Sequence, residues 1–200
     1  IRNKKKYAMK KMILREISDI NLVKEKTDLL FNFIRKTQCN GVTKIYGAQC
    51  EKKNEAEYNY YVLMELADID WEKEIKKRSE SKKYYTEGEL LDILKQLVRT
   101  FALLQKNNIT HRDVKPQNIL ITDNKYKISD FGEEKNLSTD GVIKQNIRGT
   151  ELYMSPILFK ALNSSHNHVV HNTYKSDVFS LGMCLLLAST LTFPSLYDIR

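Results

Sequence analysis

The sequence contains few cysteines, and their number and spacing exclude the usual structures built on cysteine. The three are Cys39, Cys50 and Cys184, an odd number with no C-x-x-C spacing among them. Neither a disulfide framework nor a zinc site is therefore indicated. Reduced thiols are typical of proteins inside the cell, so we expect an intracellular location, in the cytoplasm or the nucleus.

The sequence also lacks the apolar segments that are used for membrane insertion and secretion. Its longest apolar run, residues 181–191, is much shorter than the roughly 20 apolar residues that a membrane-spanning helix needs. Residues 1–4 read I-R-N-K and lead into a charged region, so no signal peptide is predicted. We expect no membrane span and interpret residues 181–191 as part of a buried helix.

No long block of a single charge is present, although the net charge is +8. The basic residues form short groups that are spread along the chain, such as residues 4–6, 76–78 and 82–83. Such groups are typical of a solvated surface, so we expect no nucleic-acid partner. With 200 residues, 42% of them hydrophobic, the chain is long enough to bury a core as one or two domains.

Hydrophobic periodicity predicts a mixture of strands and helices. Strands are predicted at residues 6–14, 42–50 and 58–66, and a helix at residues 16–36. A second helix is predicted at residues 86–106, because T-E-G-E at its start can form a capping box. The apolar stripe expected on this second helix consists of Leu90, Leu91, Leu94, Leu97, Val98, Phe101 and Leu104.

Two short polar stretches carry most of the chemical information. Residues 110–118 read T-H-R-D-V-K-P-Q-N, and residues 129–132 read S-D-F-G. The apolar runs between them predict a hairpin that joins two loops. Two carboxylates, an amide and an amine would then face one place, and these belong to Asp113, Asp130, Asn118 and Lys115.

This set of side chains suits phosphoryl transfer from a metal-bound nucleotide, because that reaction mainly needs positioning and neutralisation of negative charge. The Asp113 carboxylate can accept the proton of an attacking hydroxyl, and the Lys115 amine can stabilise the transferring phosphate. Asn118 and Asp130 supply the hard oxygen ligands that Mg²⁺ prefers. The residues therefore predict a site for Mg²⁺ and a nucleotide.

The first stretch resembles the H-R-D-x-x-x-x-N catalytic loop of protein kinases, and the second resembles their D-F-G turn. Residues 149–156, G-T-E-L-Y-M-S-P, are similar to the end of a kinase activation segment. Residues 176–182, S-D-V-F-S-L-G, are similar to the start of the helix beneath it. The resemblance implies an α+β, bilobal kinase-like fold, ATP and Mg²⁺ as cofactors, and proteins as substrates.

The same resemblance implies the division of the chain. Residues 1–66 would form part of the N-lobe, with the third to fifth strands and the αC helix; residues 67–70 the hinge; and residues 71–200 part of the mainly helical C-lobe. No G-x-G-x-x-G loop precedes Lys10, so we expect a partial kinase domain. The alternative is a weakly active or inactive kinase-like fragment that acts as a binding module.

On this resemblance Ala8 and Lys10 match the family's A-x-K, in which the lysine contacts the nucleotide phosphates and the alanine contacts the adenine. Lys11 is the alternative lysine. Glu25 is the expected αC glutamate that pairs with this lysine, and Asp28 is its alternative. When this helix is aligned by counting back from the following strand, its match to the family shifts by one residue. The identity of the αC glutamate therefore stays open.

The hinge and the rest of the adenine site follow from the same match. Met64 is expected as the gatekeeper, and the backbone of Glu65 and Ala67 as the groups that bind the adenine edge. Asp70 is expected to bind the ribose, and Leu120 to form the apolar floor under the adenine.

The resemblance also assigns structural residues. His111 would be a buried residue that stacks with Phe131 and is held by a backbone hydrogen bond, while Gly132 completes the turn. Arg112 would meet a phosphate on the activation segment, which predicts control by phosphorylation. The Asp177 carboxylate would brace the backbone of the catalytic loop.

Lys115 and Thr150 indicate the substrate class. The D-x-K-P-x-N pattern resembles serine/threonine kinases, and the hydroxyl of Thr150 could bridge Asp113 and Lys115. Proteins with serine or threonine acceptors are therefore the expected substrates. Ser138 and Thr139 are the candidate phosphosites of the activation segment.

Residues 163–173, N-S-S-H-N-H-V-V-H-N-T, contain three histidines within six residues. Without acidic or cysteine partners these histidines do not indicate a metal site, and an exposed polar insertion is predicted.

Overall fold

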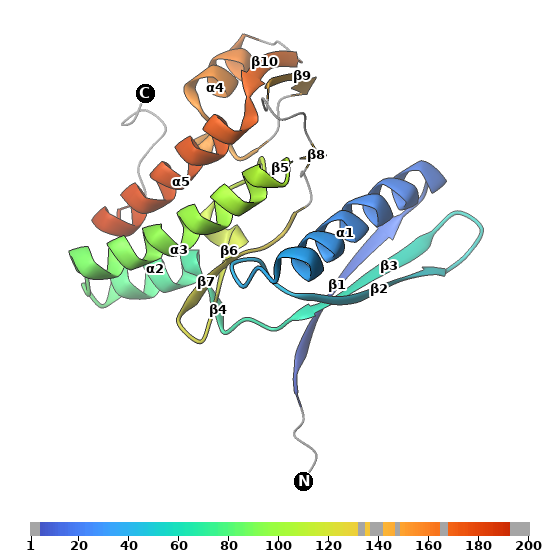
Figure 1. Cartoon of the computed structure of the whole chain (residues 1–200), viewed down its shortest axis with the longest axis horizontal. Helices are drawn as coiled ribbons and strands as arrows, with labels where there is room; N and C mark the ends of the chain where they lie inside the picture. Colours follow the sequence, from blue (N-terminus) through green and yellow to red (C-terminus); the bar gives the residue numbers. More distant parts are fainter. Residues whose placement is uncertain (1–4, 132–134, 137–141, 147–148, 165–167, 193–200) are drawn as a thin grey trace.

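The computed structural model of the protein describes residues 5–131, 135–136, 142–146, 149–164 and 168–192. Its elements form two groups, a small sheet with one long helix and a mainly helical group beside it (Figure 1). The sheets are small and antiparallel. This architecture confirms the predicted α+β class and its two-part organisation.

The first group consists of β1 (Tyr7–Leu14), α1 (Ile17–Thr37), β2 (Ile45–Lys52) and β3 (Tyr58–Glu65). The strands are antiparallel in the order β1-β3-β2. Their existence confirms the three predicted strands and the first predicted helix. Alternate residues of β1 are half-buried, so Lys10 faces the interior side of the sheet.

The second predicted strand begins later than expected, at Ile45. Val42 forms a parallel bridge with Ile128, and the Thr43 N–H donates to the Ile128 carbonyl at 3.0 Å. Residues 42 and 43 are therefore bonded to the helical group, and only the residues after them can pair with β3.

The second group holds the catalytic-loop candidates between its helices and short strands. Among the described residues it contains three antiparallel sheets, with the strand orders β4-β6-β7, β5-β8 and β9-β10. Its elements are β4 (Ile69–Asp70), α2 (Trp71–Glu80), α3 (Glu87–Lys106), β5 (Ile109–Thr110), η1 (Pro116–Asn118), β6 (Ile119–Thr122), β7 (Lys125–Ile128), β8 (Lys135–Asn136), β9 (Val142–Asn146), η2 (Glu151–Tyr153), α4 (Pro156–Asn163), β10 (His168–Asn172) and α5 (Thr173–Thr190).

The predicted capping box of α3 is present, because Thr86 and Glu89 exchange side-chain-to-backbone hydrogen bonds. The predicted apolar stripe is partly wrong. Leu91 and Val98 are 44% and 48% exposed, whereas Ile93, outside the predicted stripe, is buried. Helical spacing alone allows either the face with Leu91 and Val98 or the face with Ile93 to be buried. The contacts of α3 with α5 and β7 determine which face is buried.

The central helix α5 contains most of the apolar run at residues 181–191 and is buried, as predicted. Cys184 and Leu187 have no exposed surface and pack with Trp71 and Leu97 in the largest core cluster. Within the described part of the chain, no helix is both long and apolar enough to cross a membrane.

A second core cluster joins the two groups. Phe33 and Cys39, at the end of α1, pack with Val42, Leu104 and Ile109. This cluster fixes the C-terminal half of α1 on the helical group, so the groups meet at a defined place next to the catalytic-loop candidates.

Gly41 makes the closest approach at this junction, and its replacement by alanine is expected to destabilise the fold. A Cβ at this position would lie 1.8 Å from Thr100 Oγ1, and Thr100 is buried in α3. We expect Gly41→Ala to lower the free energy of unfolding by about 1–3 kcal/mol, measured by urea denaturation.

The control is Gly182→Ala on α5, where an added Cβ meets no atom within 4 Å. Because alanine favours helix, we expect this variant to be stabilised by about 0.4–1 kcal/mol. Equal stability of the two variants would contradict the steric explanation.

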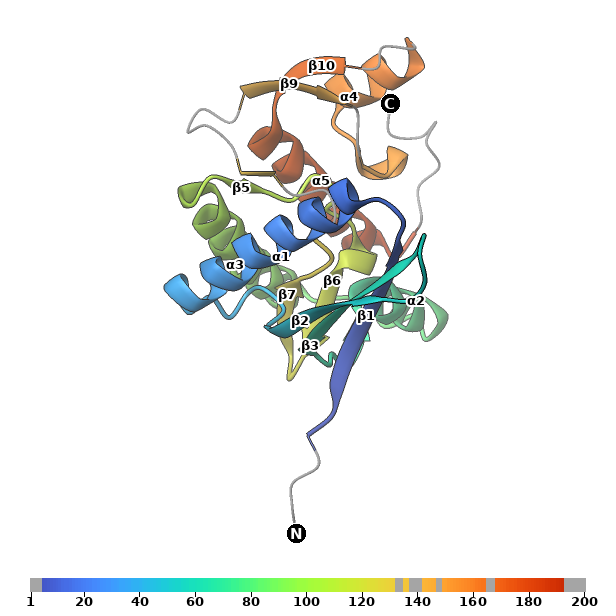
Figure 2. The ribbon, with the colours of Figure 1, turned by 90° about the vertical axis from the view of Figure 1, so that its right-hand side faces the viewer.

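The segment before α5 differs from its prediction. Residues His168–Asn172 form β10, which pairs with β9, instead of an exposed polar insertion. Both strands lie at the end of the molecule away from the β1-β3-β2 sheet (Figure 2). His171 is only 7% exposed. Pairing across this sequence separation leaves no local pattern, which is why the sequence did not indicate it.

Candidate active site

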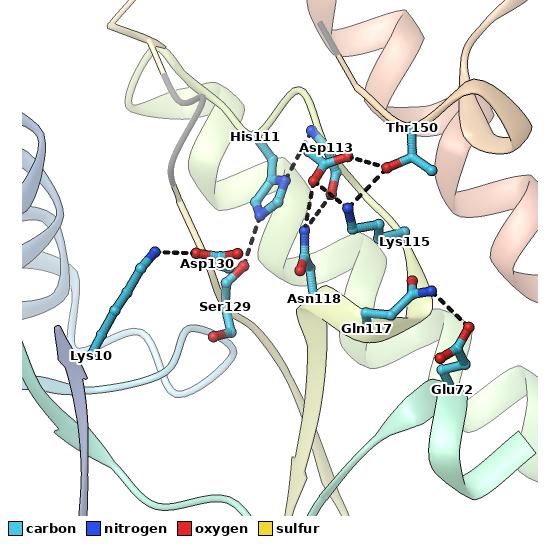
Figure 3. Close-up of polar contacts among 10 residues, drawn as sticks. All are labelled: Lys10, Glu72, His111, Asp113, Lys115, Gln117, Asn118, Ser129, Asp130 and Thr150. Carbon is cyan, nitrogen blue, oxygen red and sulfur yellow. Dashed lines mark hydrogen bonds and ion pairs between the residues drawn. The ribbon is translucent and has the colours of Figure 1, made fainter. Parts of the chain in front are cut away.

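Asp113, Lys115 and Thr150 form a triangle of polar contacts (Figure 3). The Lys115 Nζ lies 2.8 Å from Asp113 Oδ2 and donates to Thr150 Oγ1 at 2.9 Å. The Thr150 hydroxyl in turn donates to Asp113 Oδ1 at 2.9 Å. The predicted bridging geometry of Thr150 is therefore present, and it ties the two loops at residues 113 and 150 together.

Asn118 is oriented by the same carboxylate. Its Nδ2 donates to the Asp113 backbone carbonyl at 2.8 Å and to Asp113 Oδ2 at 3.1 Å. Asn118 lies at the end of η1, where Pro116 suits the first helical position. Because the amide nitrogen of Asn118 donates to Asp113, the amide oxygen is the atom of Asn118 that can bind a metal ion.

The pKa of Asp113 reflects these contacts. Burial raises the pKa of the carboxyl group, but the hydrogen bonds from Lys115 and Thr150 outweigh it and hold the pKa below its usual value. Asp113 is therefore a carboxylate near neutral pH, as a proton acceptor must be.

Asp177 braces the backbone of the catalytic loop, as expected. Its Oδ2 accepts from Thr110 Oγ1 at 2.7 Å and from the His111 N–H at 2.8 Å. Its Oδ1 accepts from the Arg112 N–H at 2.8 Å. Arg112 has a φ of 70°, which is unfavourable for a residue with a side chain, so this brace holds a strained turn in place.

His111 occupies the structural position that was expected for it. The side chain is 1% exposed, and its ring lies 4.8 Å from the Phe131 ring in an edge-to-face arrangement. Its Nε2 is 2.9 Å from the Ser129 carbonyl oxygen, and its Nδ1 accepts from the Asp113 N–H at 3.2 Å. Both ring nitrogens are thus engaged with backbone groups, which fits a structural role.

Lys10 and Asp130 form an ion pair across the two groups of elements. Asp130 has a φ of 57°, and its side chain is 51% exposed. The pair connects β1 to the turn that follows β7, so it joins the sheet to the catalytic half of the molecule.

A cavity of about 630 Å³ lies beside this ion pair. This volume falls within the range of about 300–1,000 Å³ typical of small-molecule sites. Its lining combines apolar groups with two lysine amines, those of Lys10 and Lys26. The other predicted site residues that line it are Ala8, Met64, Asp130 and Phe131.

Comparison with known proteins adds to this geometry. A family model described as the protein kinase domain matches residues 1–198 of the chain. The chain belongs to the protein kinase family. The match covers nearly the whole sequence, so the kinase assignment includes both groups of elements.

Curated relatives are consistent with this membership. The kinase is 39% identical to serine/threonine-protein kinase cds1 of Schizosaccharomyces pombe over 51% of its chain and 22% of that protein. It is 40% identical to serine/threonine-protein kinase TIO of Arabidopsis thaliana over 53% of its chain and 8% of that protein. With serine/threonine-protein kinase 36 of Pongo abelii it shares 35% identity over 56% of its chain and 9% of that protein. The chain thus matches between 8 and 22% of the length of these relatives.

The residues of the kinase fit the cofactors that are general to the family. Apolar groups and the two lysine amines in one cavity suit a base and its phosphates. Among the described residues, no group of three or more His, Cys, Asp or Glu side chains could hold a metal ion. Mg²⁺ does not need such a group, because it binds one or two carboxylates together with phosphates and water.

The expected αC glutamate is not where the sequence placed it. Neither Glu25 nor Asp28 forms an ion pair with Lys10 among the described residues, and Lys10 contacts Asp130 instead. The face of α1 towards the cavity consists of Leu22, Val23, Lys26, Thr27 and Leu30. Glu25 is exposed and does not line the cavity, whereas its neighbour Lys26 does. The identity of the αC glutamate therefore remains open.

Two residues expected at the hinge and the ribose, Glu65 and Asp70, make contacts within the chain. The Glu65 N–H donates to the Lys44 carbonyl at 2.9 Å, and this bond uses only the N–H of the Glu65 backbone. Asp70 caps α2 by accepting from the Lys73 N–H at 2.9 Å, and it pairs with Lys73 Nζ at 2.7 Å. The expected roles of Glu65 at the adenine edge and of Asp70 at the ribose therefore remain predictions.

Ala67 and Leu120 are not among the residues that line the cavity. Leu120 lies on β6, opposite Asp70 of β4 and Lys127 of β7. Its expected place under the adenine and the adenine contact of Ala67 therefore remain predictions. Gly132 and the candidate phosphosites Ser138 and Thr139 lie outside the described residues.

One contact of the catalytic loop was not predicted. Gln117 Nε2 donates to Glu72 Oε1 at 2.7 Å, so η1 is joined to the start of α2. Gln117 stands directly before Asn118, and the contact helps to fix the turn that presents the metal-ligand candidate. Only the position of Gln117 inside the catalytic motif could have indicated it.

Proposed function

We propose that the protein transfers the γ-phosphate of ATP to serine and threonine hydroxyls of protein substrates. The contact triangle of Asp113, Lys115 and Thr150 is the observation that carries this proposal. It places an ionised carboxylate next to a lysine amine and the hydroxyl of Thr150, a residue of the activation segment.

Asp113 acts as the proton acceptor in this mechanism. A carboxylate offers about four lone-pair positions, and Lys115, Asn118 and Thr150 contact it in the structure. A position remains for the hydroxyl of a substrate. The lowered pKa keeps Asp113 ionised until that hydroxyl transfers its proton.

Lys115 has two tasks. Its amine fixes the carboxylate of Asp113, and its positive charge stabilises the negative charge that develops on the transferring phosphate. Thr150 links both residues to the activation segment, so the triangle is complete only when residues 149 and 150 are in place.

Asn118 and Asp130 would hold Mg²⁺, and Lys10 would bind the nucleotide phosphates. Bound Mg²⁺ neutralises phosphate charge and orients the phosphates for transfer. The Asn118 amide is oriented by Asp113, which keeps its oxygen directed away from the proton acceptor. Lys10 and Asp130 already meet, so the two binding functions lie side by side.

The serine/threonine class is supported by two observations. The D-x-K-P-x-N sequence supplies Lys115 at hydrogen-bond distance from Thr150. The three relatives named above are also described as serine/threonine-protein kinases.

The acceptor class can be tested directly. The chain is incubated with Mg²⁺, γ-labelled ATP and a mixed protein substrate, and the labelled amino acids are identified after hydrolysis. We expect label on serine and threonine, and its loss when a chelator removes Mg²⁺. Label on tyrosine would contradict the proposal, and nucleotide binding without any label would favour the binding-module alternative.

A further inference from the structure

The antiparallel pair of β9 and β10 connects the activation segment, residues 130–156, to the segment that leads into α5. Five residue pairs form the ladder, from His168 opposite Asn146 to Asn172 opposite Val142. β10 contacts α4, and both strands lie at the end of the molecule away from the β1-β3-β2 sheet (Figure 2). The ladder gives the backbone of residues 142–146 a hydrogen-bonding partner within the chain.

His171 is the buried residue of β10. Its side chain is 7% exposed, whereas His168 on the same strand lies in the exposed class. His171 lines a cavity of about 20 Å³ together with Arg112, Gly149 and Thr150. The ring therefore faces the catalytic loop and the end of the activation segment at once.

The Nδ1 atom of His171 is buried and has no hydrogen-bond partner among the described residues. A buried polar atom without a partner is unfavourable, and such an atom normally meets a water molecule or another polar group. The cavity exceeds the roughly 10–15 Å³ that one water molecule requires. It thus has room for a single water that joins His171 to the polar groups of the catalytic loop.

The strand also continues directly into the helix that braces this loop. The Asn172 side chain caps α5 by accepting from the Lys175 N–H at 3.0 Å. Asp177, which holds the backbone of His111 and Arg112, follows in the next turn. A displacement of β10 would therefore act on the activation segment and on the catalytic loop together.

We propose that β10 is a positioning element for the activation segment, and that His171 is the buried anchor that fixes it against the catalytic loop. The inference rests on the proposed function, because it concerns the geometry of that same site. The ladder and the anchor hold Gly149 and Thr150 in place by contacts within the chain, so the triangle with Asp113 forms without a phosphate on the activation segment.

The charge state of His171 follows from its surroundings. Burial is the largest effect on the His171 ring and lowers its pKa, and the positive charge of Arg112 acts in the same direction. The Val169 carbonyl and the Asp177 carboxylate raise the pKa, but the net pKa lies below the usual value. The charged side chains that line the cavity are Arg112, Asp113 and Asp177. The folded protein thus favours a neutral ring, and the anchor weakens as the pH falls below the ordinary histidine pKa of about 6.5.

The test compares His171→Ala with His168→Ala, the matched control on the same strand. Hydrogen exchange of the amides at residues 142–146 is measured in each variant, together with kcat and the KM for ATP. We expect His171→Ala to exchange these amides about tenfold faster and to lower kcat about tenfold with little change in KM, because misplaced catalytic groups act mainly on the chemical step. The His168→Ala variant should match the unmodified chain in both measurements.

A third variant separates positioning from a general loss of structure. His171→Asn keeps a polar side chain that does not titrate, so we expect it to retain the protection of these amides. The protection factor, which is the exchange rate relative to that of an unfolded amide at the same pH, should then no longer vary between about pH 5.5 and 7. Unchanged exchange at residues 142–146 in a folded His171→Ala variant would overturn the proposal. A rise in kcat would overturn it as well, since β10 would then restrain the enzyme. Exchange is measured without turnover, so failure of the proposed function would leave this test intact.

Discussion

Replacement of Asp113 by asparagine is expected to lower kcat for phosphoryl transfer by about 10²–10⁴-fold, the range typical of the loss of a general base. The variant keeps the size of the side chain but removes its negative charge. The new NH₂ group would replace one of the two oxygens and direct its hydrogen atoms at donors, either the Thr150 hydroxyl at Oδ1 or the Lys115 amine and the Asn118 amide at Oδ2. Proton acceptance and the orientation of the loop would be lost together.

The matched control is Asp123→Asn, in the turn between β6 and β7. Asp123 is exposed and has a φ of 49°, a conformation that asparagine tolerates well. This control makes the same charge change away from the triangle, so its kcat should equal that of the unmodified chain. The affinity for ATP, measured by equilibrium binding, should change little in either variant, because Asp113 does not line the cavity at Lys10. Undiminished transfer by Asp113→Asn would remove Asp113 from the role of proton acceptor.

The loops of the site could be predicted from the sequence because their chemistry depends on short spacings. Asp113, Lys115 and Asn118 lie within six residues, so the local turn alone brings them together. The partner Thr150 was predictable for a different reason, since it follows Gly149 in a stretch that resembles the end of a kinase activation segment.

The predictions that failed concern rotations and long-range contacts. Glu25 and Lys26 are neighbours on α1, and the helical period does not determine which of them faces the cavity; packing of Leu30 and Phe33 into the interior does. The pairing of β10 with β9 is likewise not encoded in the polar composition of residues 163–173.

Asp177→Ala should be the most destabilising of the changes considered. The carboxylate is 4% exposed and accepts from three donors, the Thr110 hydroxyl and the N–H groups of His111 and Arg112. Each buried donor left without a partner costs about 1–3 kcal/mol, so we expect the free energy of unfolding to fall by about 3 kcal/mol or more. Chemical denaturation monitored by circular dichroism would measure this change.

Val178→Ala provides the control on the same helix, because Val178 is 62% exposed and its truncation should change the free energy of unfolding by less than about 0.5 kcal/mol. The Asp177→Asn variant distinguishes a brace from a simple core residue. Its amide oxygen can still accept from one or two of the donors, whereas its NH₂ group would meet a donor, so its stability should lie between those of Asp177→Ala and the unmodified chain. Because Asp177 also holds Arg112 at a φ of 70°, both variants should lose activity even under conditions in which they are fully folded. Full activity in folded Asp177→Ala would show that the strained turn at Arg112 keeps Asp113 in position without this brace.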